Sequence, residues 1–341
     1  MKKPMRNKKI TKKMKRKLRI FYMKILLCSL AILSMGKLAN IIVSSSSKDF
    51  AVGGKVKLDF TKELKYEEIF PHVANINDFR NINKVSDEDV EQMKIKIIKY
   101  LGENINDASI CYYDINSGKS FNINEKREFK AASTVKVPVS MMLYDAINKG
   151  EITEKDTIVF KNQDMEQGFG GLVNEDLSKP KTFKHINESM IIYSDNVAVN
   201  MLLRYFGNQR RYNYLESIVE HKVNRTDNLA SAEDLMKILK RLYFEQDSNP
   251  YYTNIIELMK RTSFHERLDK LLPKDIVAHK IGDYSDSDGT YSHDVGIIFT
   301  DEPYILVVMT KNLSNSYDEI ANISKIVYDI QTKQPFKKES L

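Results

Sequence analysis

The feature that most constrains this chain is the apolar run from Val137 to Leu143, which directly follows Lys136. A helix that is apolar on every side has to be buried in the core of a folded domain. Pro138 is compatible with the first turn of such a helix, where its missing N–H would have no partner. Ser133 stands three residues before Lys136, and residues at this spacing share one helix face. We therefore expect a hydroxyl and an amine to meet at the start of a buried helix.

This pair of residues suggests a nucleophile. Burial disfavours the charged form of the Lys136 amine, and an uncharged amine can accept the proton of a neighbouring hydroxyl. The S-x-x-K pattern is weak evidence by itself, because it occurs four times in the chain, starting at Ser34, Ser45, Ser133 and Ser178. Of the four serines, only Ser133 is followed by a strong apolar run. The alternative interpretation is a helix-capping serine with a solvated lysine after it.

Composition excludes some classes of protein. The net charge of the 341 residues is +7, but residues 1–19 carry eleven Lys or Arg and no acid, which leaves −4 for the rest. This mildly acidic remainder argues against nucleic-acid binding. Cys28 and Cys111 fall in an apolar N-terminal segment and a predicted strand, so we expect no disulfide between them. No Cys/His spacing is typical of a zinc site, and we predict neither a metal nor a cofactor.

Residues 1–43 combine a basic flank with a mostly apolar stretch. The cleanest part of that stretch, Ile25–Gly36, is shorter than the ~20 residues that a full membrane span needs. The segment is typical of either a secretory signal or an uncleaved signal anchor, with the following chain outside the cytoplasm. Residues 44–85 begin as a polar linker and continue as an extended arm or a small strand pair.

Residues 86–341 are predicted to form one folded domain. A helix over 86–102 precedes a hairpin, with strands at 109–115 and 120–124, and then the helix of Ser133. The middle of the domain contains helices over 185–193, 197–206, 210–219, 231–244 and 251–261. Three strands at 276–282, 291–300 and 304–310 and a final helix over 317–330 follow. This order predicts an α+β fold, an α-β-α sandwich with an antiparallel sheet built from both chain ends and a helical subdomain between them.

Two more short motifs follow the nucleophile pair. An S-D-N sequence occurs once, at 194–196, between two predicted helices, where the simplest interpretation is a helix N-cap. A K-x-G sequence occurs once, at 280–282, at the end of a predicted strand. Glycine there lets a substrate backbone approach the strand. The alternative is a solvated lysine near a strand end.

The three motifs occur in the order S-x-x-K, S-D-N and K-x-G, on a helix, at a helix–helix turn and on a strand. In this order and context the chain resembles the class A β-lactamase-like serine hydrolases and other penicillin-recognising enzymes, over roughly residues 86–332. The resemblance implies that the domain 86–341 is catalytic. It implies that Ser133 forms an acyl-enzyme, with Lys136 as base and Ser194 relaying a proton to the leaving nitrogen.

The same resemblance implies a substrate-binding role for four residues. Asn196 would hold the amide side chain of the substrate, and Lys280 would supply positive charge near its carboxylate. Gly282 belongs to the same strand motif. The backbone N–H groups of Ser133 and Asp283 would form the oxyanion hole, which needs donors preset where charge develops.

One departure from the family concerns the middle of the third motif. Ile281 stands where the family usually has Thr or Ser, so a hydroxyl that would bind the substrate carboxylate is missing. The hydroxyls of Ser285, Ser287 and Thr290 are the candidates to replace it.

A second departure concerns hydrolysis of the acyl-enzyme. Class A β-lactamases carry a loop glutamate that activates the deacylating water, and the corresponding segment is missing here. Residues 216–227 run almost directly into the next helix cap at Ser231. Glu216 and Glu220 are interpreted as surface positions of a helix, which predicts slow release of the acyl group.

Two remaining clusters are interpreted as structural. His279, His293 and Asp294 flank the late strands, where satisfied strand histidines and a turn aspartate are the favoured interpretation. The glycine pair before Leu172 is expected to form a backbone turn below the site.

We therefore predict an extracytoplasmic serine hydrolase, membrane-anchored through its N-terminal segment or secreted. β-Lactams or D-alanyl peptides would acylate Ser133, with slow hydrolysis of the acyl-enzyme. The alternatives are a D,D-peptidase of the penicillin-binding type that acts on the peptidoglycan stem peptide, and a non-catalytic module that binds β-lactams or the cell wall.

Overall fold

The computed structural model describes residues 84–273 and 275–333. The predicted signal or anchor at 1–43, and the predicted linker up to residue 83, lie outside these residues. Within the described ranges, no helix combines the length and the apolar character needed to cross a bilayer.

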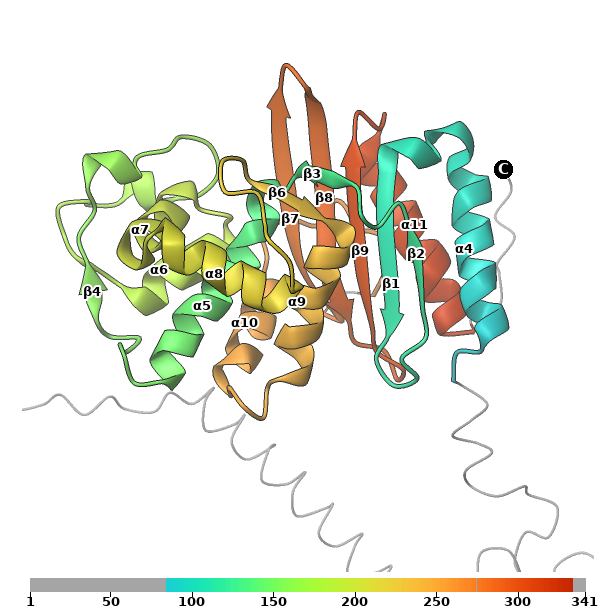
Figure 1. Cartoon of the computed structure of the whole chain (residues 1–341), viewed down its shortest axis with the longest axis horizontal. Helices are drawn as coiled ribbons and strands as arrows, with labels where there is room; N and C mark the ends of the chain where they lie inside the picture. Colours follow the sequence, from blue (N-terminus) through green and yellow to red (C-terminus); the bar gives the residue numbers. More distant parts are fainter. Residues whose placement is uncertain (1–83, 274, 334–341) are drawn as a thin grey trace, which may run out of the picture. The chain divides into compact units, whose positions relative to one another are not determined.

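Five strands form one antiparallel sheet in the order β2-β1-β9-β8-β7. The strands are β1 (Ala108–Asp114), β2 (Ser120–Ile123), β7 (Val277–Asp286), β8 (Gly289–Ile298) and β9 (Tyr304–Lys311). β1 pairs with β9, so that Cys111 lies opposite Val307. The two ends of the domain therefore meet inside the sheet, and the predicted α+β architecture is confirmed (Figure 1).

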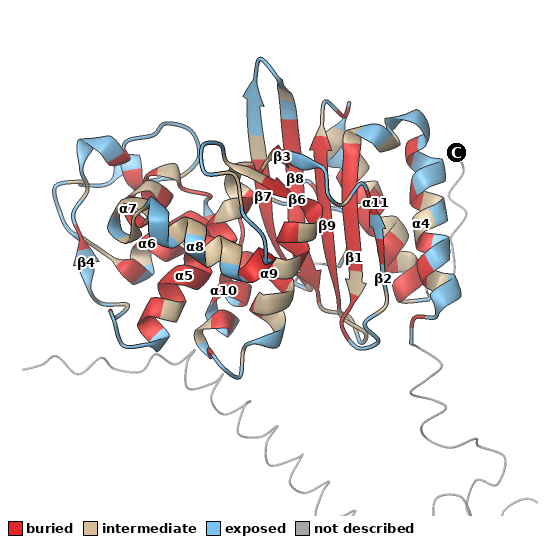
Figure 2. Cartoon of the chain, in the orientation of Figure 1, coloured by how far each residue is buried: buried red, intermediate tan, exposed pale blue. Residues whose placement is uncertain are grey.

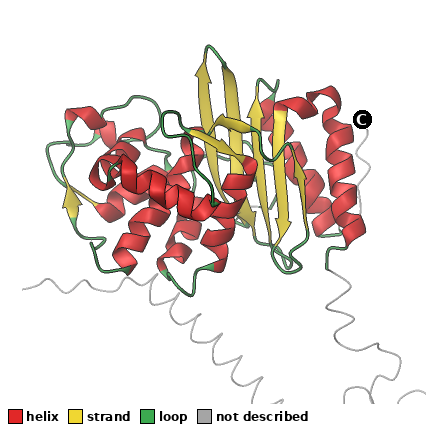
Figure 3. Cartoon of the chain, viewed as in Figure 1, coloured by secondary structure: helices red, strands yellow, loops and turns green. Residues whose placement is uncertain are grey.

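Alternating residues of the sheet divide the apolar interior into two cores. Along β1, Ile110 and Tyr112 face one core, and Cys111 between them faces the other. Helices α4 (Asp87–Leu101) and α11 (Ser316–Gln331) cover the first face, and the helical subdomain covers the second (Figure 3). Figure 2 shows the central strands β1, β9 and β8 buried along most of their length, as the middle layer of a sandwich must be, whereas the edge strand β2 is partly exposed.

The helical subdomain contains the five helices predicted between residues 185 and 261, with ends that differ by at most two residues. The helix predicted to start with Ser133 begins at Lys136, because residues 132–135 form a 3₁₀ turn before it. The helices of the subdomain are α5 (Lys136–Asn148), α6 (Phe183–Ile192), α7 (Asn196–Phe206), α8 (Asn208–Val219), α9 (Ala232–Phe244) and α10 (Tyr251–Lys260). Ser231 begins α9 with a capping box, in which its hydroxyl accepts from the Asp234 N–H. α5 is buried along nearly its whole length, as its apolar sequence predicted.

Two short strand pairs were not predicted. β3 (Glu128–Lys130) pairs with β6 (Leu229–Ser231), and β4 (Thr157–Ile158) pairs with β5 (Lys181–Thr182). Runs of two or three residues are too short to show a period of two, so the sequence carries no signal for them. The first pair ties the segment before Ser133 to the chain that follows α8.

Short 3₁₀ turns complete the domain: η1 (Gly102–Asp107), η2 (Ala132–Val135), η3 (Asn162–Asp164) and η4 (Leu172–Asn174). The segment around η3 is held by Arg204, which contacts Asp164 through two N–H groups at 2.7 and 2.9 Å. Asp164 is 1% exposed, so this ion pair is needed to satisfy a buried carboxylate.

Candidate active site

The predicted nucleophile and base lie side by side. Ser133 belongs to η2 and Lys136 begins α5, and Lys136 Nζ lies 2.9 Å from Ser133 Oγ. The lysine is 2% exposed, whereas the serine is partly exposed. A hydroxyl that solvent can reach therefore contacts a buried amine, which is the geometry that the i, i+3 spacing predicted.

The backbone of the nucleophile turn is strained and is braced from outside. Ala132 has a φ of 50°, in the left-handed region that disfavours residues with a Cβ atom. The Ala131 N–H donates to the Asn228 carbonyl at 2.8 Å, and Asn228 Nδ2 donates to the Ala132 carbonyl at 3.1 Å. A strained turn persists only where its surroundings fix it, and such turns cluster at functional sites. The sequence analysis did not identify Asn228, which belongs to the loop before β6.

The residues of the S-D-N motif have two different roles, which are helix capping and contact with the predicted base. Asp195 caps α7, with Oδ1 accepting from the Ala198 N–H at 2.8 Å. Its neighbours contact the base instead: Lys136 Nζ donates to the Ser194 carbonyl at 2.6 Å and lies 2.7 Å from Asn196 Oδ1. The N-cap interpretation is therefore confirmed for Asp195, whereas Ser194 and Asn196 lie beside the predicted base.

The glycine turn before η4 packs directly against this motif. Asp195 Oδ2 accepts from the Leu172 N–H at 2.8 Å, and the Asn196 N–H donates to the Phe169 carbonyl at 3.0 Å. Gly170 has a φ of +113°, and a Cβ atom there would lie 2.1 Å from Asp195 Oδ2. Only glycine fits this position, so the turn supports the motif from behind, as the sequence predicted.

The third motif brings a second amine to the same place. Lys280 is fully buried, and its Nζ donates to Ser194 Oγ at 2.9 Å and to the Ile281 carbonyl at 3.1 Å. Gly282 differs from our expectation that it makes room for substrate. A Cβ atom there would lie 3.1 Å from the Ala131 carbonyl, so this glycine allows β7 to pack against the nucleophile turn.

Burial controls the charge of both amines. It lowers the pKa of Lys136 to about 8, although the carboxylates of Asp195 and Glu166 act in the opposite direction. Burial, together with the positive charge of Lys136, holds the pKa of Lys280 well below its usual value. Both amines lie within hydrogen-bond distance of Ser194 Oγ, at 3.3 and 2.9 Å, so protonation of one disfavours protonation of the other.

The hydrogen-bond acceptors around Lys136 determine where the lone pair of its uncharged Nζ can point. An uncharged amine has two N–H groups, and the Ser194 carbonyl and Asn196 Oδ1 can only accept. When these two oxygens take both N–H groups, the lone pair is left for the hydroxyls of Ser133 and Ser194, and Ser133 Oγ is the nearer, at 2.9 Å against 3.3 Å. The hydroxyl of Ser133 can then donate its proton to Lys136, which is the arrangement that general-base activation requires.

Asp283 faces a different group. Its carboxylate accepts from Arg267 and, at 3.1 Å, from the Tyr317 hydroxyl. Its backbone N–H stays our predicted oxyanion donor. Arg267 also donates to the His293 carbonyl at 2.6 Å, so a buried guanidinium holds β7 at the end where Asp283 lies.

The hydroxyls considered as replacements at Ile281 lie near the far end of the β7–β8 hairpin. Ser285 Oγ donates to Thr290 Oγ1 at 3.2 Å, and both residues are exposed. Ser287 is exposed in the turn beyond them. None of the three has a hydrogen bond to the motif residues within the described chain, and Ile281 itself is 3% exposed.

The glutamates that follow S-D-N lie away from the nucleophile. Glu216 accepts from Arg225 at 2.9 Å and from Lys222 at 2.7 Å, and Glu220 ends α8 with an exposed side chain. Residues 220–228 lead from α8 straight into β6. Glu220 is a surface position, as predicted, whereas the side chain of Glu216 is only 10% exposed and is covered by its two cationic partners, so the prediction was wrong for Glu216.

Three residues near the site were missed because irregular segments carry them. Glu166 acts on Lys136 through its charge and accepts from Asn200 Nδ2 at 2.8 Å. Phe169 and Phe264 meet edge to face, with ring centroids 5.5 Å apart. Lys280 Nζ lies 5.9 Å from the centroid of the Phe264 ring. Neither periodicity nor a motif marks any of them.

The two strand histidines are held by the fold. The Nε2–H of His293 donates to the Lys130 carbonyl at 2.8 Å, and its Nδ1 accepts from the Thr310 N–H at 3.1 Å. Burial lowers the pKa of His293 to about 4, so the ring is neutral. His279 Nδ1 lies 2.9 Å from Asp294 Oδ2. These contacts agree with the structural interpretation of both histidines. The expectation of a turn aspartate was wrong, because Asp294 lies inside β8 and is fully buried, where it accepts from the Leu268 N–H at 3.0 Å.

The sheet, the helical subdomain and the three converging motifs together define the class of β-lactamase-like serine enzymes. Solved structures share the fold. PBP-A is 22% identical, with a TM-score of 0.64, over 71% of this chain and 96% of that chain. A PBP-A mutant in an acyl-enzyme complex with penicillin G is 22% identical, with a TM-score of 0.64, over 72% of this chain and 97% of that chain. The TLA-1 extended-spectrum β-lactamase is 21% identical, with a TM-score of 0.65, over 72% of this chain and 99% of that chain. The sequence model of the β-lactamase enzyme family matches residues 92–331, and the chain belongs to this family.

Proposed function

We propose that this protein is a serine acyl enzyme that β-lactams or D-alanyl peptides acylate at Ser133, and that its acyl-enzyme is hydrolysed slowly. The observation that carries the proposal is the position of Lys136 Nζ, 2.9 Å from Ser133 Oγ, with two oxygens placed to take its N–H groups. Ser133 Oγ is therefore the nearest hydroxyl from which the buried amine can accept a proton.

Acylation then proceeds by a balanced exchange. Ser133 Oγ attacks the carbonyl carbon of the substrate amide, and the hydroxyl proton passes to Lys136 Nζ. The C–N bond breaks, and a proton reaches the leaving nitrogen through the Ser194 hydroxyl, which lies 3.3 Å from Lys136 Nζ. The backbone N–H groups of Ser133 and Asp283 stabilise the oxyanion. The product is an ester on Ser133.

The charge of the site supports an anionic substrate. The hydrogen-bond partners of Lys136 and Lys280 are hydroxyl, carbonyl and amide oxygens, so within the described residues neither lysine is paired with a carboxylate. A penicillin or a D-alanyl peptide brings a carboxylate close to the amide that reacts. The acyl-enzyme of PBP-A with penicillin G, in a protein of the same fold, also supports a β-lactam as ligand.

Slow hydrolysis follows from the missing loop glutamate. Between α8 and β6 the chain offers Glu220 at the start of a short loop, and its side chain is exposed. Glu216 is engaged by two cations. Water that attacks the ester therefore lacks the base that the family's efficient β-lactamases supply.

We also propose that the enzyme works outside the cytoplasm, secreted or held by its N-terminal segment. The eleven cations of residues 1–19, followed by an apolar stretch, support this location. The peptidoglycan stem peptide would then be the natural substrate, as for a D,D-peptidase of the penicillin-binding type. A module that binds β-lactams or the wall without chemistry is the competing function.

Mass spectrometry of the full-length protein with benzylpenicillin, followed over time, tests the proposal. We expect one penicilloyl adduct on Ser133 that persists after free drug is removed. Ser133→Ala should show no adduct, and Ser178→Ala, which changes another serine of an S-x-x-K sequence, should be labelled like the wild type. An adduct on Ser133→Ala, or none on the wild type, would refute acylation at Ser133.

Two further measurements separate the alternatives. Fast steady-state turnover of nitrocefin would contradict slow hydrolysis. Release of D-alanine from a stem peptide would favour the D,D-peptidase, and absence of both labelling and peptide cleavage would favour the binding module.

A further inference from the structure

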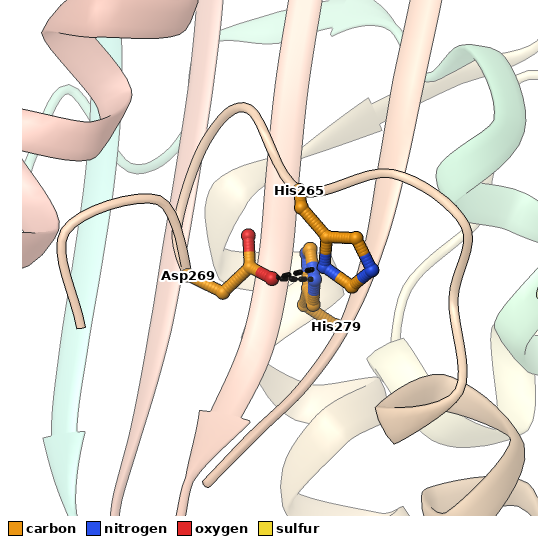
Figure 4. Close-up of side chains that lie close together, drawn as sticks. All are labelled: His265, Asp269 and His279. Carbon is orange, nitrogen blue, oxygen red and sulfur yellow. Dashed lines mark hydrogen bonds and ion pairs between the residues drawn. The ribbon is translucent and has the colours of Figure 1, made fainter. Parts of the chain in front are cut away.

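A second cluster of side chains lies on the other face of β7. Successive strand residues point to opposite faces, so His279 faces away from the side where Lys280 meets the S-D-N motif. The loop between α10 and β7 brings His265 and Asp269 to His279 (Figure 4). One ligand atom from each of the three residues lies within 4.8 Å of the other two. No sequence spacing predicted this cluster, because its members come from a loop and a strand.

The distances single out the carboxylate of Asp269 as the centre. Its Oδ2 lies 2.5 Å from His265 Nδ1 and 3.5 Å from His279 Nε2. Metal–ligand bonds of about 2.0–2.1 Å in a tetrahedral site place the donor atoms roughly 3.3 Å apart. The separation to His279 is therefore close to that of a formed site. The side chain of His265 is 63% exposed and hydrogen-bonded to Asp269 Oδ2 at 2.5 Å, so its ring has to turn out of that hydrogen bond before both groups can bind one ion.

An independent observation comes from the buried ring of His279. This residue is 1% exposed, and Asp294 holds its Nδ1 at 2.9 Å. Its Nε2 makes no hydrogen bond and faces Asp269 Oδ2 only at the ion-pair distance of 3.5 Å, and Asp269 Oδ1 has no hydrogen-bond partner. Buried polar atoms are nearly always satisfied at close range, so this long contact leaves room for an ion between the ring and the carboxylate.

The donor set matches a transition metal. Two imidazole nitrogens and one carboxylate oxygen are ligands that Zn²⁺ prefers. A metal-binding histidine usually donates its other ring N–H to a carboxylate, which fixes the tautomer, and Asp294 is placed to do this for His279. The exposure of His265 leaves a fourth position for water.

We propose that His265, Asp269 and His279 form a site for one divalent transition-metal ion, Zn²⁺ foremost, with Asp294 as the positioning residue of His279. The ion would link the exposed His265 of the α10–β7 loop to the buried His279 of β7. Phe264, beside His265, lies against Lys280, so the same loop reaches the nucleophile side of β7. The proposal does not depend on the acylation chemistry.

Calorimetric titration of the chelator-treated, full-length protein with Zn²⁺ tests the site, and Co²⁺ provides a spectroscopic probe of its ligands. We expect one ion per chain, and visible Co²⁺ bands of a four-coordinate site with nitrogen ligands. His265→Ala should lower the Zn²⁺ affinity at least about tenfold, since even outer partners of a ligand change affinity by that factor. Asp269→Asn should act in the same direction.

The chain offers a matched control at the surface. His185 lies 2.9 Å from a carboxylate oxygen of Glu175 and is 42% exposed at its side chain, and the two residues belong to no group of three possible ligands within the described chain. His185→Ala should leave the affinity and the Co²⁺ spectrum unchanged. Absence of stoichiometric binding, or equal affinities of the wild type and His265→Ala, would overturn the site. Because the readout is metal binding itself, a failure here is distinct from a failure to acylate Ser133.

Discussion

Acidification should slow the acylation of Ser133 by reducing the uncharged fraction of Lys136. The pKa of this lysine is lowered to about 8, chiefly by burial. With that value, roughly 1% of the molecules hold an uncharged amine at pH 6 and about half at pH 8. If only the uncharged amine accepts the hydroxyl proton, the rate at pH 6 is about 100-fold below its plateau at high pH.

The assay is the second-order rate constant for labelling of the full-length protein by a fluorescent penicillin, measured from pH 6 to 9.5. We expect a slope near tenfold per pH unit below the pKa and a plateau above it. Lys136→Arg keeps a permanent positive charge, so it should lose roughly 10²–10⁴-fold in rate and show no rise with pH. Lys136→Ala should show the same loss.

Two results would refute this reasoning. A labelling rate that stays constant from pH 6 to 9 would mean that the protonation state of Lys136 does not control the nucleophile. A rise with the same midpoint in Lys136→Ala would assign the titration to another group, and Lys280 is the nearest amine.

Three other predictions concern the support of the site. In urea denaturation, Gly170→Ala should destabilise the fold by at least about 2 kcal/mol, because the added Cβ atom would overlap the Asp195 carboxylate. Gly171→Ala is the control and should be nearly neutral, because a Cβ atom there would have no atom within 4 Å. Arg204→Ala leaves a buried carboxylate unpaired and should cost about 3–5 kcal/mol in the same assay, against less than about 1 kcal/mol for Arg210→Ala in an exposed pair. Folding lowers the pKa of His293 from 6.5 to about 4, so between pH 4 and 6.5 the unfolded chain binds more protons than the folded protein. The free energy of unfolding should therefore fall by roughly 3 kcal/mol as the pH drops from 6.5 to 4. In melting experiments at different pH, His293→Asn should remove that part of the acid dependence.

The sequence predicted the long elements and the three motifs because each has a local cause. The apolar run after Lys136 dictates a buried helix, and the capping residues Ser86 and Ser231 mark the starts of α4 and α9. β9 is a nearly continuous apolar run because the sheet has a core on both faces. Motif order then placed Lys136 and Lys280 in one site, and the structure brings both amines to Ser194 Oγ.

What the sequence could not predict depends on contacts between distant segments. Asn228 fixes the nucleophile turn from the loop after α8, and Gly282 allows β7 to pack closely on that turn. Phe264 and Glu166 reach the site from irregular chain, where no period exists. Their roles depend on the tertiary path of loops, which local patterns do not encode.

The burial that makes Lys136 a candidate base also weakens the fold, and this conflict is what made the site visible in the sequence. Lowering the pKa of this lysine from 10.5 to about 8 corresponds to roughly 3 kcal/mol of lost stability at neutral pH, where the unfolded chain and the folded protein both hold the proton. Between pH 8 and 10.5 the unfolded chain binds more protons, so this loss fades as the pH rises. A domain selected for stability alone would not place an amine without a carboxylate partner at the start of its most apolar helix. The cost is explained if the amine has to accept a proton from Ser133, and a second buried amine at Lys280 is explained if the substrate brings the missing negative charge.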